Sequence, residues 1–141
     1  MLVKFRVALP VQFRDIDRMG HVNHAVYLQY METARVMLAK RLGMIRTVSS
    51  SSFIVAMAHV EYKQPIREEE HVTVTCWISR IGTRSWDLDY TVRSGRVENA
   101  IGRTTQVSYD YKTRKTVKIS ERLRKNLQKW AGKPIKFREI S

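Results

Sequence analysis

A carboxylate placed just before a helix N-terminus is the feature of this sequence with the clearest chemical use. Asp17 precedes the turn Gly20-His21-Val22-Asn23-His24, which leads directly into an amphipathic helical pattern. A carboxylate can activate water, or it can attack an electrophile itself. The backbone N–H groups of a first helical turn have no partner within the helix and can hold a developing oxyanion. This order of residue types indicates hydrolytic chemistry and leaves open whether Asp17 acts as base or nucleophile.

The polar neighbours of Asp17 have structural interpretations as well as functional ones. Asn23 is a natural N-cap, which would fix the direction of the first-turn N–H groups. Asp15 is interpreted as a structural residue, with Arg14 and Arg18 as its charge partners. Its spacing from Asp17 would place both carboxylates on the same face of an extended segment.

The histidines of the turn fit more than one role. His21 fits substrate contact and simple filling of the turn equally well. His24 can donate its backbone N–H or its side chain to a substrate oxygen. Together with Asp17 they could approach a metal, but no fourth ligand is evident, so no metal site is predicted. His59 lies in a strand-like run and is interpreted as a sheet histidine.

The elements that must position these residues can be read from the periodicity of the sequence. Residues 3–13 alternate as a first strand with an edge or irregular end at Pro10. Apolar residues then recur at steps of three and four over about 24–42, which predicts a helix that stops at Gly43. The apolar stripe of this helix consists of Tyr27, Met31, Ala34, Leu38 and Leu42.

Successive hairpins follow a serine-rich stretch at 47–52, which is interpreted as a flexible loop. Glycine-containing joints between alternating runs predict an antiparallel sheet, and a short basic helix is expected over 120–130 with Ser120 as its cap. The fold class is therefore α+β, in which the sheet must cover the long helix. A sheet this short leaves apolar surface exposed, which predicts a homo-oligomer. The predicted strands span 53–64, 71–81, 85–94 and 99–111.

The charge of the chain is concentrated near its end. The formal net charge is +13, and from Lys112 onward eleven Lys or Arg residues face only two acidic ones. Such a surface can attract nucleic acid, a phosphorylated substrate or an acidic carrier protein, or it can simply be solvated. Nucleic acid is disfavoured, because Trp130 and Phe137 are the only aromatic residues available in this region for base stacking.

The sequence also carries information on the cellular compartment of the protein. No apolar run approaches the roughly 20 residues of a membrane span, and the N-terminus lacks the apolar block of a signal peptide. The single Cys76 cannot form an internal disulfide and is interpreted as a packed strand residue. These features predict a cytoplasmic protein.

The motifs together resemble those of the hotdog-fold acyl-CoA thioesterases of the 4-hydroxybenzoyl-CoA thioesterase type. The likeness rests on Asp-x-Asp-x-x-Gly-His-Val-Asn-His-x-x-Tyr at 15–27 and Glu-x-Ala-Arg at 32–35, with Tyr-x-x-Pro at 62–65. It continues at 102–110 and covers about 3–125. The resemblance implies a hotdog fold, in which an antiparallel sheet of five to six strands wraps around one long helix. It implies one domain over 1–141, with a basic C-terminal helix and tail at about 118–141.

The resemblance also implies functional roles. Asp17 occupies the place of the catalytic carboxylate, and His24 that of the oxyanion donor. Members of the family pair as dimers, with each site drawing on both subunits, so a homodimer or a dimer of dimers is expected. No cofactor is expected beyond the coenzyme A of an acyl-CoA substrate. The residues expected to contact substrate are Gly20, His21, Asn23 and Tyr27.

Three functions remain open at this point. Hydrolysis of an acyl-CoA thioester leads, and a thioesterase for acyl carrier protein is the alternative within the same chemistry. The third is a non-catalytic hotdog module that binds an acyl or CoA group, which would usually lack an Asp at position 17. The arginines considered for the coenzyme A phosphates, against the simpler interpretation as solvated strand-end charges, are Arg80, Arg84 and Arg103.

Overall fold

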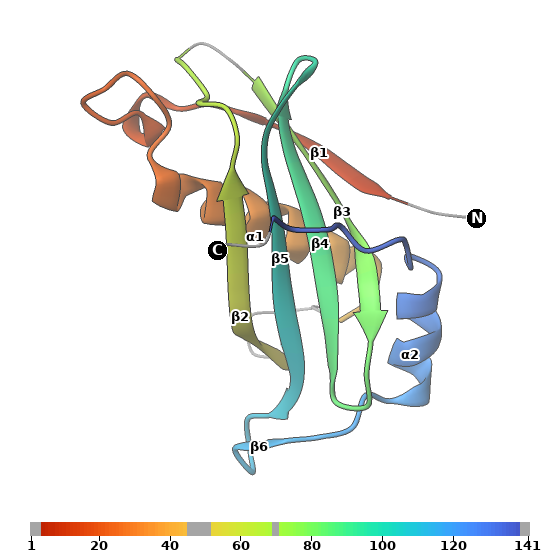
Figure 1. Ribbon diagram of the computed structural model, residues 1–141. Coiled ribbons are helices and arrows are strands. Elements are labelled where there is room, and N and C mark those ends of the chain that lie inside the picture. Colours follow the sequence, from red (N-terminus) through yellow and green to blue (C-terminus); the bar gives the residue numbers. More distant parts are fainter. Residues whose placement is uncertain (1–3, 45–51, 69–70, 139–141) are drawn as a thin grey trace.

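An antiparallel sheet with one long helix on one of its faces forms the framework of the protein (Figure 1). The computed structural model describes residues 4–44, 52–68 and 71–138. Its strands follow the order β1-β3-β4-β5-β2, and the short β6 pairs with β5. Within the described residues, each pair of neighbouring strands in this sheet is antiparallel, as predicted. The strands are β1 (Phe5–Pro10), β2 (Phe53–Tyr62), β3 (His71–Ile81), β4 (Ser85–Ser94), β5 (Val97–Asp110) and β6 (Lys115–Thr116).

The helix α1 spans His24–Arg41, close to the predicted range. The Asn23 side chain accepts a hydrogen bond from the Ala25 N–H at 2.9 Å, so the predicted N-cap is confirmed. Gly43 has a φ of +71°, the left-handed conformation that commonly follows a helix end. The predicted apolar stripe is buried, with every member at most 7% exposed: Tyr27, Met31, Ala34, Leu38 and Leu42.

A close approach between α1 and β5 sets the distance between helix and sheet. A Cβ atom on Gly102 would lie 2.6 Å from the Met31 Cε atom and 3.1 Å from the His59 carbonyl oxygen. The missing side chain at position 102 therefore gives Met31 the space to pack directly on the strand. Met31 itself is fully buried, so α1 is held firmly over the centre of the sheet.

The first strand is shorter than the sequence predicts. β1 ends at Pro10, on the edge of the sheet, because proline has no N–H to continue the ladder. A single 3-10 turn at Phe13–Asp15 follows in place of further strand. The Asp15 carboxylate closes this turn by accepting a hydrogen bond from the Gln12 N–H at 2.8 Å.

The two hairpins joining β3, β4 and β5 are as predicted. Gly82 donates its N–H to the Ser85 carbonyl at 2.7 Å, and Gly95 turns with a φ of +59°. β3 and β4 match their predicted bounds, whereas β2 ends two residues earlier and β5 begins two residues earlier than predicted. The loop predicted at 47–52 lies outside the described residues except for its last member.

The C-terminal part of the chain begins beside β3 and then crosses the face of the sheet opposite α1 (Figure 1). The helix α2 (Glu121–Gln128) is capped by Ser120 as predicted and lies beside β3. Residues 131–138, here called the C-terminal strap, then cross in front of the sheet toward β2 (Figure 1). At the far end of the strap, the Arg138 N–H donates to the Glu61 carboxylate at 3.1 Å. Of the helices that the structure describes, neither is long and apolar enough to cross a membrane.

Candidate active site

The segment between β1 and α1 forms a tight turn around the Asp17 carboxylate. Asp17 Oδ1 accepts hydrogen bonds from the N–H groups of Met19 at 2.9 Å and His21 at 3.4 Å. Gly20 has a φ of +81°, a conformation that side-chain-bearing residues rarely adopt. These contacts hold one carboxylate oxygen in place, whereas Oδ2 accepts no hydrogen bond from any described residue.

Two long-range contacts tie this turn to the chain that follows β2. The Val22 N–H donates to the Ile66 carbonyl at 2.8 Å, and His21 forms an isolated antiparallel bridge with Arg67. Ile66 is fully buried. The turn that carries Asp17 is therefore fixed from both sides, by its own hydrogen bonds and by the segment after β2.

Asp17 lines a hollow of about 300 Å³ at the N-terminal end of α1. Four of the six residues predicted for the site line this hollow: Asp17, His21, His24 and Tyr27. Gly20 and Asn23 do not line the hollow. Gly20 allows the turn to form, and Asn23 caps the helix. The far wall consists of residues from the end of β2 and just beyond it: Tyr62, Lys63, Gln64 and Pro65.

One backbone donor of the first helical turn is left unused at this hollow. Asn23 accepts hydrogen bonds from the second and third N–H groups of the helix. The Ala25 N–H donates to the Asn23 side chain, and the Val26 N–H donates to the Asn23 carbonyl. The His24 N–H, by contrast, donates to no described acceptor. An unused N–H at a helix N-terminus can stabilise a negative oxygen, and the helix dipole adds to that effect.

Tyr62 is a wall residue that the sequence did not single out for the site. Its hydroxyl donates to the His24 carbonyl at 2.7 Å, and its ring meets the Tyr27 ring edge-on at a centroid distance of 4.9 Å. Burial raises the pKa of this hydroxyl, which keeps it a donor at neutral pH. The available signal was the Tyr-x-x-Pro motif at 62–65, which carried the family resemblance without a role for its tyrosine.

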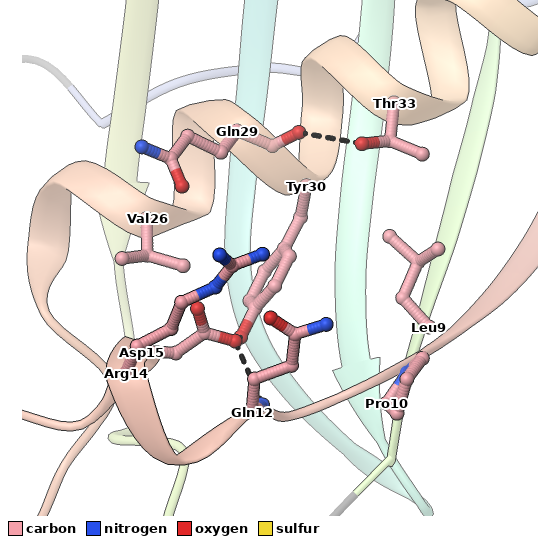
Figure 2. Close-up of a pocket in the computed structure, with 9 residues that line it drawn as sticks. All are labelled: Leu9, Pro10, Gln12, Arg14, Asp15, Val26, Gln29, Tyr30 and Thr33. Carbon is pink, nitrogen blue, oxygen red and sulfur yellow. Dashed lines mark hydrogen bonds between the residues drawn. The ribbon is translucent and has the colours of Figure 1, made fainter.

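Asp15 and Asp17 line different hollows, which corrects the expectation that the two carboxylates share a face, because Asp15 lies in a 3-10 turn and not on an extended segment. Asp15 and Tyr30 line a separate hollow of about 560 Å³ beside β1, shown in Figure 2. The Tyr30 hydroxyl donates to Asp15 Oδ2 at 2.9 Å, and burial together with this contact raises the pKa of Tyr30. The partners of Asp15 are thus Tyr30 and the Gln12 N–H, and not Arg14 or Arg18. This larger hollow contains none of the predicted site residues.

The arginines considered for coenzyme A phosphates already have partners within the chain. Arg103 pairs with the buried Asp89 at 2.6 Å, and Arg80 pairs with Asp87 at 2.9 Å. Arg84 donates to the Thr116 carbonyl at 2.9 Å. These contacts favour the structural interpretation of all three.

His59 is a sheet histidine, as interpreted from the sequence. Its ring packs edge-on against Phe137 of the strap, and Nε2 lies 3.5 Å from the Glu61 carboxylate. Across the described ranges, no three His, Cys, Asp or Glu side chains come together in a way that could hold a metal ion.

Cys76 is fully buried in β3, and burial raises the pKa of its thiol to about 12. At pH 8 the thiol is therefore protonated, and thiolate is the reactive form. We expect less than a tenth of native protein to react with iodoacetamide under conditions that label the denatured protein completely. Intact-mass measurement of both samples checks this, and rapid labelling of the native protein would contradict it.

Comparisons with known proteins identify the family of this chain. The family model of the thioesterase-like superfamily matches residues 11–127, so the chain belongs to that superfamily. A curated relative, the putative acyl-CoA thioesterase YneP of Bacillus subtilis (strain 168), is 32% identical over 73 residues, which cover 50% of this chain and 53% of that protein. The chain spans about half the length of the curated relatives that it matches.

Two solved structures extend the comparison to nearly the whole fold. A predicted thioesterase from Bacillus stearothermophilus superposes with a TM-score of 0.89 at 21% identity, covering 94% of this chain and 99% of that one. A thioesterase from Thermus thermophilus, solved with coenzyme A and Zn, gives a TM-score of 0.81 at 30% identity, covering 87% and 96%. The predicted family and its hotdog-like fold are confirmed, and the names of YneP and of the Thermus thermophilus protein support the prediction of a thioester hydrolase.

Proposed function

We propose that this protein hydrolyses acyl-CoA thioesters, with Asp17 as the carboxylate that activates water or attacks the thioester. The observation that carries this proposal is the hollow in which Asp17 and the N-terminus of α1 face the same space. A thioester bound there would meet a fixed carboxylate on one side and an unused backbone donor on the other.

The chemistry needs no further group. A thioester carbonyl is a good electrophile and a thiolate is a good leaving group. The His24 N–H would bind the carbonyl oxygen as it becomes negative, and the helix N-terminus strengthens that binding. Asp17 Oδ2, which accepts no hydrogen bond from the described residues, would take a proton from water or attack the carbonyl carbon.

Coenzyme A is the proposed carrier of the acyl group. The Thermus thermophilus thioesterase, whose chain is 30% identical to this one, was solved with coenzyme A. YneP is likewise named as a putative acyl-CoA thioesterase. An acyl carrier protein remains the alternative, because the basic surface of this chain would complement an acidic protein.

A homodimer paired through β2 is part of the same proposal. β2 is an edge strand of ten residues, and it exposes Ile54, Val55 and Met57 to solvent in the single chain. An open apolar edge readily pairs with a second strand. Two-fold pairing of β2 with β2 would cover these side chains and would bring a second subunit up to the wall of the hollow that contains Tyr62.

A substrate panel with detection of the released thiol tests the proposed function. We expect turnover of at least one acyl-CoA among short, long and aromatic acyl groups, with the same acyl groups on acyl carrier protein turned over more slowly. Faster turnover of the carrier-protein thioesters would favour the alternative carrier. Binding of acyl-CoA without turnover, across the whole panel, would favour a non-catalytic binding module and contradict the proposal.

A further inference from the structure

The hollow beside β1, here called the Asp15 hollow, is separate from the candidate active site. Its volume of about 560 Å³ lies within the roughly 300–1,000 Å³ of sites for small molecules. The Asp15 hollow and the hollow of Asp17 share none of their described lining residues. Leu9 and Pro10 of β1 form one wall (Figure 2). The wall on α1 consists of Val26, Gln29, Tyr30 and Thr33.

The Asp15 carboxylate in this hollow is buried and has one oxygen without a partner. Oδ2 accepts hydrogen bonds from the Tyr30 hydroxyl at 2.9 Å and from the Gln12 N–H at 2.8 Å. Oδ1 accepts none from any described residue, although only 7% of Asp15 is exposed. Buried polar atoms normally have a hydrogen-bond partner, and a buried charge needs one most. A cationic donor from outside the chain would supply this partner and neutralise the charge.

Arg14 adds a positive charge to the same hollow. Its side chain is exposed and lines the hollow, and it forms no ion pair with an acidic side chain in the described part of the chain. The hollow therefore contains a carboxylate and a guanidinium that are not joined to each other. A ligand with both an ammonium and a carboxylate group would pair with both, whereas a simple cation would be repelled by Arg14.

The apolar part of the lining indicates what else the ligand carries. Leu9, Pro10 and Val26 present hydrocarbon surface to the hollow, which an apolar side chain of the ligand would cover. We infer that the Asp15 hollow binds an α-amino acid with an apolar side chain, its ammonium group on Asp15 Oδ1 and its carboxylate on Arg14. This assignment does not rest on the proposed hydrolysis of thioesters, because the two sites have different walls.

Titration of the isotope-labelled protein with leucine and with phenylalanine, followed by NMR of the backbone amides, tests the site. The Gln12 N–H donates to Asp15 Oδ2, and the Asn23 N–H donates to the Asp15 carbonyl at 2.8 Å. We expect both signals to shift to saturation. The Met19 N–H, which donates to Asp17 Oδ1, reports on the other hollow and should shift less. Without a saturable shift at Gln12 for any apolar amino acid, the assignment falls.

Two analogues of leucine separate the contributions of its charged groups. Isocaproic acid lacks the ammonium group, and we expect it to bind at least about 10-fold more weakly than leucine, as loss of a hydrogen bond to a buried charge gives. Isoamylamine lacks the carboxylate and should bind about 3-fold more weakly, because an exposed ion pair with Arg14 contributes less. If either analogue binds as tightly as leucine, the site does not recognise amino acids and the assignment is wrong.

Asp15→Asn is the variant that removes the charge and keeps the shape. Its side-chain oxygen can still accept from Tyr30 and Gln12, whereas its NH₂ group takes the place of Oδ1 and cannot accept the ammonium group. We expect the dissociation constant for leucine to rise at least about 10-fold. The matched control, Asp17→Asn, makes the same substitution in the other hollow and should leave leucine binding unchanged. Unchanged binding by Asp15→Asn, or an equal loss in both variants, would overturn the assignment.

Arg14→Gln provides a test that does not alter the buried carboxylate. Because the Arg14 side chain is exposed, we expect this variant to fold as the wild type does. Its dissociation constant should rise about 3-fold for leucine and stay the same for isoamylamine, which has no carboxylate to lose a partner. An equal effect on both ligands, or no effect on leucine, would mean that Arg14 does not bind the carboxylate, and the assignment to an amino acid would be wrong.

Discussion

Replacement of Asp17 by asparagine is expected to lower kcat for acyl-CoA hydrolysis by about 10²- to 10⁴-fold, the range that a positioned acid–base group contributes. Asparagine keeps an Oδ1 acceptor for the N–H groups of Met19 and His21, which Asp17 now engages. The turn should therefore keep its shape, since asparagine forms the same local hydrogen bond as aspartate. What the variant loses is the negative charge that activates water or attacks the thioester.

Two controls separate the loss of chemistry from loss of structure. Asp110→Asn makes the same change in a similar turn, where Asp110 accepts the Lys112 N–H, and it should not lower kcat. The unfolding midpoint of Asp17→Asn in urea should lie close to that of the wild type. Turnover of Asp17→Asn within 10-fold of the wild type would remove Asp17 from the proposed mechanism.

A trapping experiment on the wild-type protein can show whether Asp17 acts as a base or as a nucleophile. If Asp17 attacks the thioester, a mixed anhydride forms between its carboxylate and the acyl group as the thiolate leaves. Hydroxylamine added during wild-type turnover would then give an Asp17 hydroxamate that peptide mass spectrometry detects. If Asp17 only activates water, no modified Asp17 peptide appears at any hydroxylamine concentration.

Local patterns in the sequence were enough to predict the elements that carry the site. The Asn23 cap, the buried stripe of α1 and both hairpins depend on residues a few positions apart, so periodicity and turn chemistry reveal them. The turn that contains Asp17 is local as well. Its resemblance to a known family therefore pointed to the side chains that line the hollow.

Contacts between distant residues were not predictable in this way. Tyr62 reaches His24 across 38 positions, and no periodicity of β2 indicates that its last residue meets the start of α1. For Asp15, sequence neighbours suggested Arg14 and Arg18, but Tyr30 on the buried side of α1 is the actual partner. The buried Tyr30 hydroxyl needs a hydrogen-bond acceptor and is held next to Asp15 by packing, whereas the arginine side chains can be solvated by water. The assignment of the whole chain to one domain stays a prediction.

The attachment of the C-terminal strap to the sheet was also missed, because it depends on one buried carboxylate. Asp89 is fully buried in β4. It accepts hydrogen bonds from Arg103 Nε at 2.6 Å and Arg103 Nη2 at 2.8 Å, and from the Ser79 hydroxyl at 2.7 Å. Its Oδ2 also accepts the N–H of Ile135 in the strap at 2.7 Å, 46 positions away. A lone Asp in an alternating strand gives no sign of these partners.

Asp89→Ala is therefore expected to lower the free energy of unfolding by about 3–5 kcal/mol, the usual cost of breaking a buried ion pair from one side. The variant leaves the Arg103 guanidinium, which is mostly buried, without its carboxylate, and it leaves the Ile135 N–H without an acceptor. Urea denaturation followed by fluorescence checks the loss. Limited proteolysis should show faster cleavage within the strap, because its central anchor is gone.

The second ion pair on the same face provides the matched control. Arg80 and Asp87 are also joined at 2.9 Å, but 45% of the Arg80 side chain is exposed. Asp87→Ala should therefore cost about 1 kcal/mol or less, because water can replace the carboxylate at the half-exposed Arg80 guanidinium. A double variant, Asp89→Leu with Arg103→Met, should recover part of the loss by removing the unpaired guanidinium. It should not recover all of it, because the Ile135 N–H still lacks an acceptor. A cost for Asp89→Ala no larger than that for Asp87→Ala would mean that water reaches the Arg103 guanidinium, and that the strap is held by its other contacts with β3 and β2.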